Sequence, residues 1–422
     1  MAAYPVPHAS FVSQCLLRIH CNSSRDKQIG RAGRPFVGQG EFGSVLDGHQ
    51  GEPVECKALP IERHAIVRPG RKKHMSLNVG KGKTKGLMAV ANERGVIAAL
   101  AIDQRSALRK LFADAMNVEP REVRAESLMQ FKEAVSRILT PHASAILLDP
   151  EYGLPAAKQR AKSSGLLLAY EKTGFDQAIS GRTPELLEHW SAARLVAAGA
   201  DAIKLLLYYS TTSSTEINDR KHALVERVGA ECGELEVPFF LELVSYAEGM
   251  DDKGPEFARI KPAVVMQGMA EFSKPQYRVD VLKVGIPVNM TFVEGSPSVG
   301  NEILYTRRES LAQYRLAASA ARVPFLYLSE GVSNETFQYA LELAAEAGVN
   351  FSGVLCGRAT WQGGVPVFVK NGPRALDEWL LEEGVENIQN VHRPLGSACS
   401  CLSVAATMGA DGHTRRKGKV RP

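Results

Sequence analysis

DAIKLLLYY, at residues 201–209, indicates the fold class of this chain. It is a short, nearly continuous apolar run that contains one internal charge, Lys204. Such a run is typical of a parallel strand that is buried on both faces of its sheet. Runs of the same kind recur along the chain as GVIAALAID (95–103), ASAILLD (143–149), GLLLAYE (165–171), VPFFLEL (237–243), DVLKVGIP (280–287), VPFLYLS (323–329) and FSGVLCG (351–357).

Longer amphipathic segments lie between most of these runs. Residues 184–201 (PELLEHWSAARLVAAGAD) and 334–350 (NETFQYALELAAEAGVN) have helical spacing and a glycine near their ends, which is a helix-stop signal. Eight strands with intervening helices predict an α/β fold, a single-domain (β/α)8 TIM barrel. The stretch between the second and third runs has little helical pattern, so an open doubly wound sheet is the alternative.

The two ends of the chain lack this pattern. We expect residues 1–74 to be a disordered leader, residues 75–391 to form the barrel, and residues 392–422 to be a loose basic tail. Both ends are basic, whereas the whole chain carries a formal net charge of only +5. The basic balance therefore belongs to the ends and does not predict a nucleic-acid partner for the folded body.

The seven cysteines form neither a disulfide framework nor paired zinc motifs. This usage favours a reducing, cytoplasmic setting. The sequence contains no apolar run of the roughly 20 residues that a membrane helix needs, so we expect no membrane partner. A homo-oligomer is compatible with the sequence.

One motif suggests a different class of protein. GQGEFGSV (38–45) resembles the glycine-rich loop of protein kinases, and Lys57 follows at a suitable distance. A kinase also needs an H-R-D catalytic loop and a D-F-G metal-binding aspartate, and the sequence contains neither. We therefore do not expect nucleotide binding at this motif.

Most of the apolar runs contain or end in one charged residue. A charge buried in a barrel strand is costly unless it is paired or functional, and TIM barrels place their active sites at the carboxyl ends of the strands. The repetition from strand to strand therefore predicts a polar active site, with structural ion pairs as the alternative. The charged positions are Asp103, Asp149, Glu171, Lys204, Glu242, Lys283 and Arg358.

Two of these charges are lysines within apolar runs. A lysine that loses its proton can attack a carbonyl and form a Schiff base, and neighbouring carboxylates can act as general acids and bases. Lys283 is our candidate nucleophile, whereas for Lys204 pairing with Glu171 or Glu242 is an equally good interpretation. No histidine lies in a strand run, so we predict no metal site and no cofactor.

The loops after the seventh and eighth runs read SEGVSNET and CGRAT. These loops often bind phosphate in TIM barrels. Backbone N–H groups, a hydroxyl and a guanidinium would together form an anion site. The candidate phosphate-binding residues are Ser329, Gly331, Gly357 and Arg358.

These motifs together resemble the class I tagatose 1,6-bisphosphate aldolases, bacterial enzymes of lactose and galactose breakdown. The resemblance runs from about residue 78 to about residue 390 and includes segments on every strand. The segments are AIDQR (101–105), LLDPEYGLPA (147–156), LLAYEKTGFD (167–176), DAIKLLLYY (201–209), PFFLEL (238–243), DVLKVGIPVN (280–289), YLSEGVS (327–333) and GVLCGRATW (353–361).

The resemblance implies a role for each matching position and a sugar phosphate as the small-molecule substrate. Lys283 would form the Schiff base, with Glu242 as the acid–base group. Glu171 and Lys204 would lie beside the reacting carbons. Contacts to the sugar hydroxyls would come from Asp103 and Gln104, and contacts to phosphate from Ser329, Gly357 and Arg358.

Alternatives to this function remain open at the level of sequence. A related aldolase could act on fructose 1,6-bisphosphate, which differs from tagatose 1,6-bisphosphate only in configuration at C4, or on a sulfonated sugar phosphate. A non-catalytic sugar-phosphate sensor is a third possibility, although a sensor does not need an amine nucleophile. Glu330 lies within the expected phosphate loop, and we expect its carboxylate to face outward.

Overall fold

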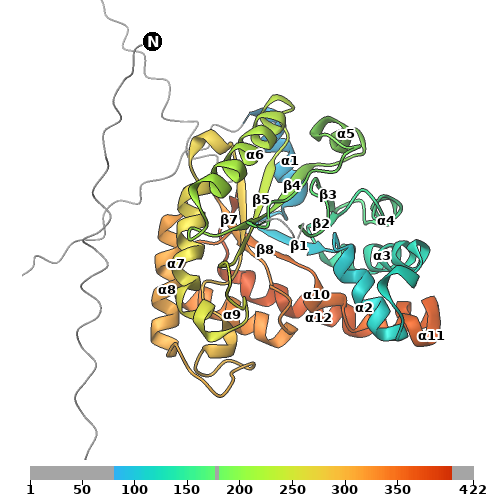
Figure 1. Ribbon diagram of the computed structural model, residues 1–422. Helices are drawn as coiled ribbons and strands as arrows, with labels where there is room; N and C mark the ends of the chain where they lie inside the picture. Colours follow the sequence, from blue (N-terminus) through green and yellow to red (C-terminus); the bar gives the residue numbers. More distant parts are fainter. Residues whose placement is uncertain (1–79, 176–179, 402–422) are drawn as a thin grey trace, which may run out of the picture. The chain divides into compact units, whose positions relative to one another are not determined.

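The computed structural model describes residues 80–175 and 180–401, and its eight parallel strands form a closed barrel in sequence order (Figure 1). The barrel closes where β1 pairs with β8 in parallel, from Ile97 opposite Gly353 to Leu100 opposite Cys356. The predicted (β/α)8 fold is therefore confirmed, and the alternative of an open sheet is wrong. The strands are β1 (Ile97–Ala101), β2 (Ala145–Leu148), β3 (Gly165–Ala169), β4 (Ala202–Tyr209), β5 (Phe239–Ser245), β6 (Val281–Val284), β7 (Phe325–Tyr327) and β8 (Gly353–Cys356).

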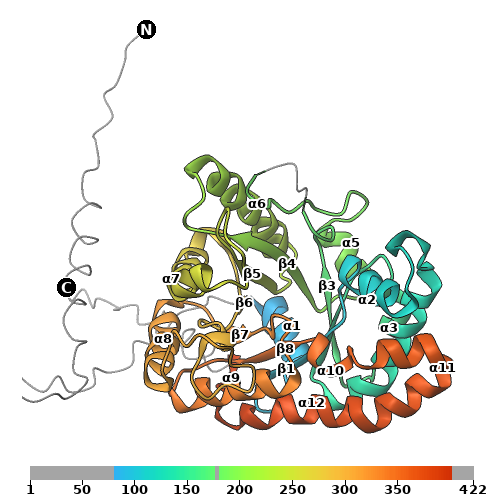
Figure 2. The ribbon, with the colours of Figure 1, turned by 60° about the horizontal axis from the view of Figure 1, so that its bottom comes forward.

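Helices alternate with the strands and pack on the outside of the barrel (Figure 2). The α-helices are α1 (Lys81–Val90), α2 (Ser106–Met116), α3 (Ala125–Leu139), α4 (Leu154–Gln159), α5 (Ala192–Ala197), α6 (Thr215–Glu234), α7 (Pro255–Phe272), α8 (Arg307–Ala320), α9 (Asn334–Glu346), α10 (Arg358–Trp361), α11 (Gly364–Trp379) and α12 (Val385–His392). Single turns of 3-10 helix lie at Pro120–Glu122, Thr140–His142, Pro275–Tyr277, Met290–Phe292 and Arg393–Ser397, and a π-helical turn at Leu380–Gly384. Helix α11 is broken at Gly372, where φ is 83°.

One predicted helix is shorter than its pattern indicates. Within residues 184–201, only α5 is α-helical. The preceding part is extended because Leu186 forms an antiparallel bridge with Glu171, and the N–H of Leu187 donates to the carbonyl of Tyr170. These bonds to the segment after β3 replace the hydrogen bonds that a longer helix would make.

The barrel interior is filled by small and medium apolar side chains from alternating strand positions. Ile97, Ala99 and Leu167 are buried in the same cluster as Leu87 and Val90 of α1. Helix α1 precedes β1 and packs across the amino-terminal end of the barrel, so it forms the barrel floor. With one end of the barrel closed by a helix, the carboxyl-terminal end is left as the place for chemistry.

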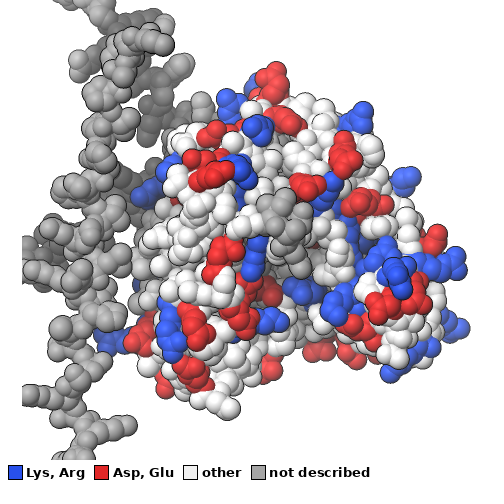
Figure 3. Space-filling view, in the orientation of Figure 1, with Lys and Arg blue, Asp and Glu red and all other residues white. Residues whose placement is uncertain are grey.

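The expected leader lies outside the described residues, as does most of the expected tail. The structure does describe residues 392–401, and here the chain is packed: Leu395 and Cys401 are buried, Cys401 against the barrel floor. Acidic and basic side chains are interspersed on the face shown in Figure 3. Among the helices in the described ranges, none is long and apolar enough to cross a lipid bilayer.

Candidate active site

A network of buried ion pairs lies at the carboxyl ends of the strands. At its centre is Lys204 of β4, whose side chain is fully buried. Its Nζ lies 2.8 Å from Asp103 Oδ2, 2.7 Å from Glu171 Oε1 and 2.8 Å from Glu242 Oε2. Asp103 and Glu171 follow β1 and β3, and Glu242 lies on β5. Three carboxylates from three separate strand ends therefore surround one ammonium group.

Lys283 of β6 joins this network through one carboxylate. Its Nζ lies 2.9 Å from Glu242 Oε1, and the two residues are directly opposite each other in the β5–β6 register. The Lys283 side chain is 4% exposed. Glu242 thus bridges the two lysines, with one oxygen toward each.

The charges explain the protonation states of the network. Burial alone would lower the pKa of Lys204, but Asp103, Glu171 and Glu242 raise it well above its ordinary value. Burial favours the neutral forms of Asp103 and Glu242, but Lys204 and Lys283 outweigh it and lower the pKa of both carboxyl groups. Lys204 is therefore a permanent cation at neutral pH, which makes it unsuitable as an amine nucleophile.

Several oxygens in this region are buried but make no hydrogen bond within the described residues. They are Asp103 Oδ1, Gln104 Oε1 and Glu242 Oε2, the last of which contacts Lys204 without hydrogen-bond geometry. A buried acceptor without a partner is costly in a finished core. Asp103 Oδ1 and Gln104 Oε1, which also lack an ion-pair partner in these ranges, form a pair of acceptors suited to the hydroxyl groups of a polyol.

The predicted phosphate-binding loops meet next to this network. An added Cβ at Gly331, where φ is 80°, would lie 2.5 Å from Arg358 Nη2, so only glycine lets the guanidinium approach the loop. A Cβ at Gly357 would lie 3.3 Å from Gln104 Nε2, since β1 and β8 are neighbours. Gln104, the residue after Asp103, thus lies against the loop that carries Arg358.

The space beside Arg358 is open. A cavity of about 540 Å³ is lined by Gly331, Ser333 and Arg358, among other residues. Ser333 caps helix α9, so backbone N–H groups of this helix start point toward the same region. Ser329, by contrast, follows β7, is buried beside Cys356 and does not line this cavity.

Glu330 is paired rather than free. Its Oε2 lies 2.6 Å from Nζ of Lys261, a buried lysine on α7, and its side chain is 27% exposed. The carboxylate also lies directly above Gly285, where an added Cβ would be 2.3 Å from Oε1. The ion pair neutralises a charge that would otherwise repel an anion in this loop.

Sequence reasoning missed two cations of the site. Arg105 donates to the Glu171 carbonyl at 2.8 Å and pairs with Glu151 at 2.6 Å. Lys132 of α3 is fully buried and pairs with Asp149, so Asp149 belongs to an ion pair separate from the network around Lys204. The available signal was a lysine on the apolar face of an amphipathic helix, between Leu128 and Val135.

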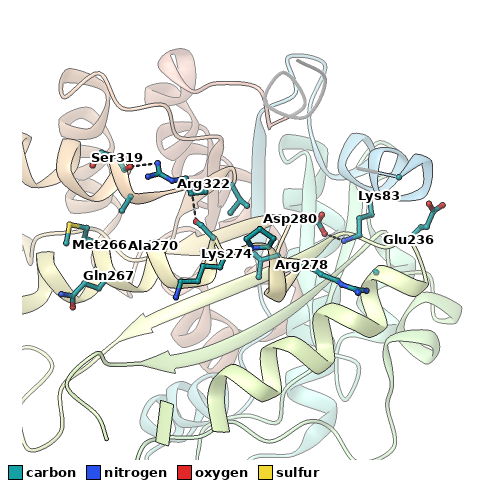
Figure 4. A pocket seen from close by; sticks show the side chains of 17 residues that line it. Lys83, Glu236, Met266, Gln267, Ala270, Lys274, Arg278, Asp280, Ser319 and Arg322 are labelled. Carbon is teal, nitrogen blue, oxygen red and sulfur yellow. Dashed lines mark hydrogen bonds and ion pairs between the residues drawn. The ribbon is translucent and has the colours of Figure 1, made fainter. Parts of the chain in front are cut away.

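A larger cavity, about 1280 Å³, lies at the opposite, amino-terminal end of the barrel (Figure 4). Its wall includes the ion pair between Lys83 of α1 and Asp280, which precedes β6. None of the candidate catalytic side chains lines it. Size alone therefore does not identify the active site here.

In the described ranges, no three His, Cys, Asp or Glu side chains are grouped so as to hold a metal ion. The chemistry available from the residues present is that of two lysines, a bridging glutamate and an adjacent anion site. An amine paired with a carboxylate can attack a carbonyl and exchange protons with the adduct.

Comparison with known proteins points to one family. Residues 97–363 match the model of the DeoC/LacD family aldolases. The chain is 51% identical over 325 residues to tagatose 1,6-diphosphate aldolase 2 of Enterococcus faecalis, covering 77% of this chain and 96% of that protein. It is 47% identical over 314 residues to tagatose 1,6-diphosphate aldolase of Staphylococcus haemolyticus, covering 74% of this chain and 95% of that one.

A solved structure shares the fold at much lower sequence identity. Fructose-bisphosphate aldolase from Plasmodium falciparum, solved with TRAP and a small-molecule inhibitor, superposes with a TM-score of 0.55 at 15% identity. The match covers 76% of this chain and 98% of that one. It supports the barrel architecture alone.

Proposed function

This chain belongs to the DeoC/LacD family of aldolases, and from this premise we propose that it cleaves D-tagatose 1,6-bisphosphate into dihydroxyacetone phosphate and glyceraldehyde 3-phosphate. The substrate follows from its relatives, several of which are named tagatose 1,6-diphosphate aldolases. We also propose, on the same basis, that it acts in the cytoplasm in the breakdown of lactose and galactose.

One observation carries the mechanism. Lys283 contacts a single carboxylate, Glu242, at 2.9 Å, whereas Lys204 is held by three. Of the two lysines, Lys283 is therefore the one that we assign as the nucleophile. Lys204 is the fixed charge that keeps Glu242 and Asp103 ionised.

The reaction then proceeds through a Schiff base. The Lys283 amine attacks C2 of the open-chain ketose, and loss of water gives an iminium ion. Glu242 accepts the proton of the C4 hydroxyl, the C3–C4 bond breaks, and its electron pair moves into the iminium to form an enamine. Glyceraldehyde 3-phosphate leaves, the enamine is protonated at C3, and water releases dihydroxyacetone phosphate and free Lys283.

The rest of the site orients the substrate. The free acceptors Asp103 Oδ1 and Gln104 Oε1 suit the sugar hydroxyls. Arg358, with the backbone near Gly331 and at the start of α9, suits one phosphate, whereas Ser329 lies buried beside Cys356. Binding energy from the phosphate, which does not itself react, positions the reacting carbons.

A related substrate remains the alternative. Fructose 1,6-bisphosphate differs from the proposed substrate only at C4, and Glu242 would meet the C4 hydroxyl of either epimer. Sulfonated sugar phosphates and a sensor role are less well supported, because the Lys283–Glu242 pair is suited to chemistry rather than to binding alone.

The test is cleavage of tagatose 1,6-bisphosphate in the presence of EDTA by wild type and by Lys283→Arg, followed as dihydroxyacetone phosphate release. The arginine keeps the ion pair with Glu242 but cannot form an imine, so kcat/KM should fall by about four orders of magnitude or more. Borohydride with dihydroxyacetone phosphate should label the wild type on Lys283 alone. A wild type without activity would refute the substrate, and an active Lys283→Arg would refute the nucleophile.

A further inference from the structure

Lys132 is a cation in an apolar environment that the mechanism above does not use. It lies on the inner face of α3 beside Phe131 and Val135, and its side chain is fully buried. Burial lowers its pKa, although Asp149 opposes the shift. Burying a charged lysine costs free energy of folding, so its contacts should explain why it is there.

All three N–H groups of the Lys132 ammonium have acceptors. Nζ donates to the carbonyl of Ile102 at 2.7 Å and to that of Gln104 at 3.0 Å, and it pairs with the Asp149 carboxylate. A buried ammonium needs an acceptor for each of its three donors, and here two of the three acceptors are peptide oxygens of one segment. These two are the peptide oxygens of the residues on either side of Asp103.

Lys132 therefore fixes the backbone that carries Asp103. The carboxylate of Asp103 depends on this placement, because Oδ2 lies 2.8 Å from Lys204 and Oδ1 is a buried acceptor without a partner in the described residues. The same ammonium links two strand ends, since Ile102 and Gln104 follow β1 and Asp149 follows β2. Asp149 is itself held, as its Oδ1 accepts from the N–H of Tyr152 at 2.7 Å.

We propose that Lys132 is a positioning residue for the aldol cleavage: from outside the barrel it holds the Ile102–Gln104 backbone so that Asp103 and Gln104 present their free oxygens to the substrate hydroxyls. This inference rests on the proposed function. A displacement of about 1 Å in such a group can reduce the rate by about 10²-fold. Lys132 does not touch the substrate, so its effect must pass through Asp103 and Gln104.

The test compares Lys132→Met with two variants that disturb the same region without releasing the backbone. Asp149→Asn keeps the lysine and its two carbonyl contacts, and a neutral amine can still donate both hydrogen bonds. Ser136→Ala removes another buried donor one turn along α3, whose hydroxyl donates to the carbonyl of Ala156 at 2.7 Å. Both controls should lower thermal stability.

The positioning role predicts a specific pattern of rates. At a temperature where circular dichroism shows all variants folded, kcat/KM of Lys132→Met should fall by about 10²-fold. Asp149→Asn and Ser136→Ala should stay within about threefold of wild type despite their lower stability. Borohydride should still trap dihydroxyacetone phosphate on Lys283 in Lys132→Met, because the nucleophile lies on β6.

Two outcomes would overturn the proposal: normal kcat/KM in Lys132→Met, or equal losses of activity in Lys132→Met and Asp149→Asn. If Lys132→Met does not fold, Lys132→Met/Asp149→Asn leaves no unpaired charge and should show the same loss of activity. An inactive wild type would instead refute the proposed function, so the two failures are distinguishable.

Discussion

Two buried lysine–carboxylate clusters lie at opposite ends of this barrel. At the amino-terminal end, Lys83 of α1 pairs with Asp280 at 2.7 Å, and the same Asp280 oxygen also accepts from the N–H of Phe239. At the carboxyl-terminal end, Lys204 contacts three carboxylates. One of them, Glu242, also forms an ion pair with Lys283. The first cluster joins a helix to the strands and the second joins strands to one another, and the side chains of both are largely buried.

The two ends differ in what remains unsatisfied. At the floor, one cation meets one carboxylate, and neither Asp280 oxygen is a buried acceptor without a partner. At the other end, Asp103 Oδ1 and Gln104 Oε1 have no hydrogen-bond partner in the described residues. Burial of charge is common to structural and catalytic clusters, whereas acceptors left open in a network of excess carboxylates distinguish the site that awaits a substrate.

The largest effect that would test this contrast between the two ends is expected for Lys204→Met. The variant leaves Asp103, Glu171 and Glu242 without their shared cation, so the pKa of Asp103 and of Glu242 should rise and Glu242 should lose efficiency as a base. We expect kcat/KM for tagatose 1,6-bisphosphate to fall by about 10²- to 10³-fold, together with reduced stability. Steady-state kinetics and urea unfolding measure both; a variant within tenfold of wild-type activity would contradict the assigned role.

The matched change at the floor is Lys83→Met. It leaves Asp280 buried and unpaired, so the free energy of unfolding should fall by about 3–5 kcal/mol. Activity at a temperature where the protein remains folded should stay within about twofold of wild type. The double variant Lys83→Met/Asp280→Asn should recover much of the stability, and a large loss of kcat in either variant would mean that the floor is coupled to the chemistry.

The smallest and sharpest comparison is the pH dependence of Asp103 and Asp280. The pKa of Asp103 is lowered from its ordinary 3.8, so the stability this group contributes is complete above pH 4 and is lost as the pH falls below it. Burial raises the pKa of Asp280 above 3.8 although Lys83 opposes it, so its ionisation destabilises the fold as the pH rises through that raised pKa.

Unfolding free energies of wild type, Asp103→Asn and Asp280→Asn between pH 3 and pH 7 would test this contrast. The advantage of wild type over Asp103→Asn should shrink toward pH 3. The difference between wild type and Asp280→Asn should move the other way, in favour of wild type at the acid end. If both differences in unfolding free energy, wild type minus variant, changed in the same direction with pH, the two carboxylates would not be in opposite electrostatic settings.

Much of this architecture could be predicted from the sequence, because buried parallel strands leave continuous apolar runs and the charges of the candidate site interrupt them. Lys204, Glu242 and Lys283 were visible for that reason. Lys132 was not, since one charge on a helical face gives no sign of which carbonyls it reaches across the fold. The helix predicted to start at residue 184 was wrong in extent, because the bridge between Leu186 and Glu171 overrides local helical spacing.

The helical floor of the barrel also sets a limit on shortened versions of this protein. Leu87 and Val90 cover the inner side chains of the strands, and Lys83 neutralises Asp280. A recombinant chain that starts after Lys83 would leave that aspartate without its counter-ion, and one that starts after Val90 would also uncover the inner side chains of the strands. Fusion partners and affinity tags at the amino terminus are therefore best joined upstream of Gly80, so that the barrel floor formed by α1 stays intact.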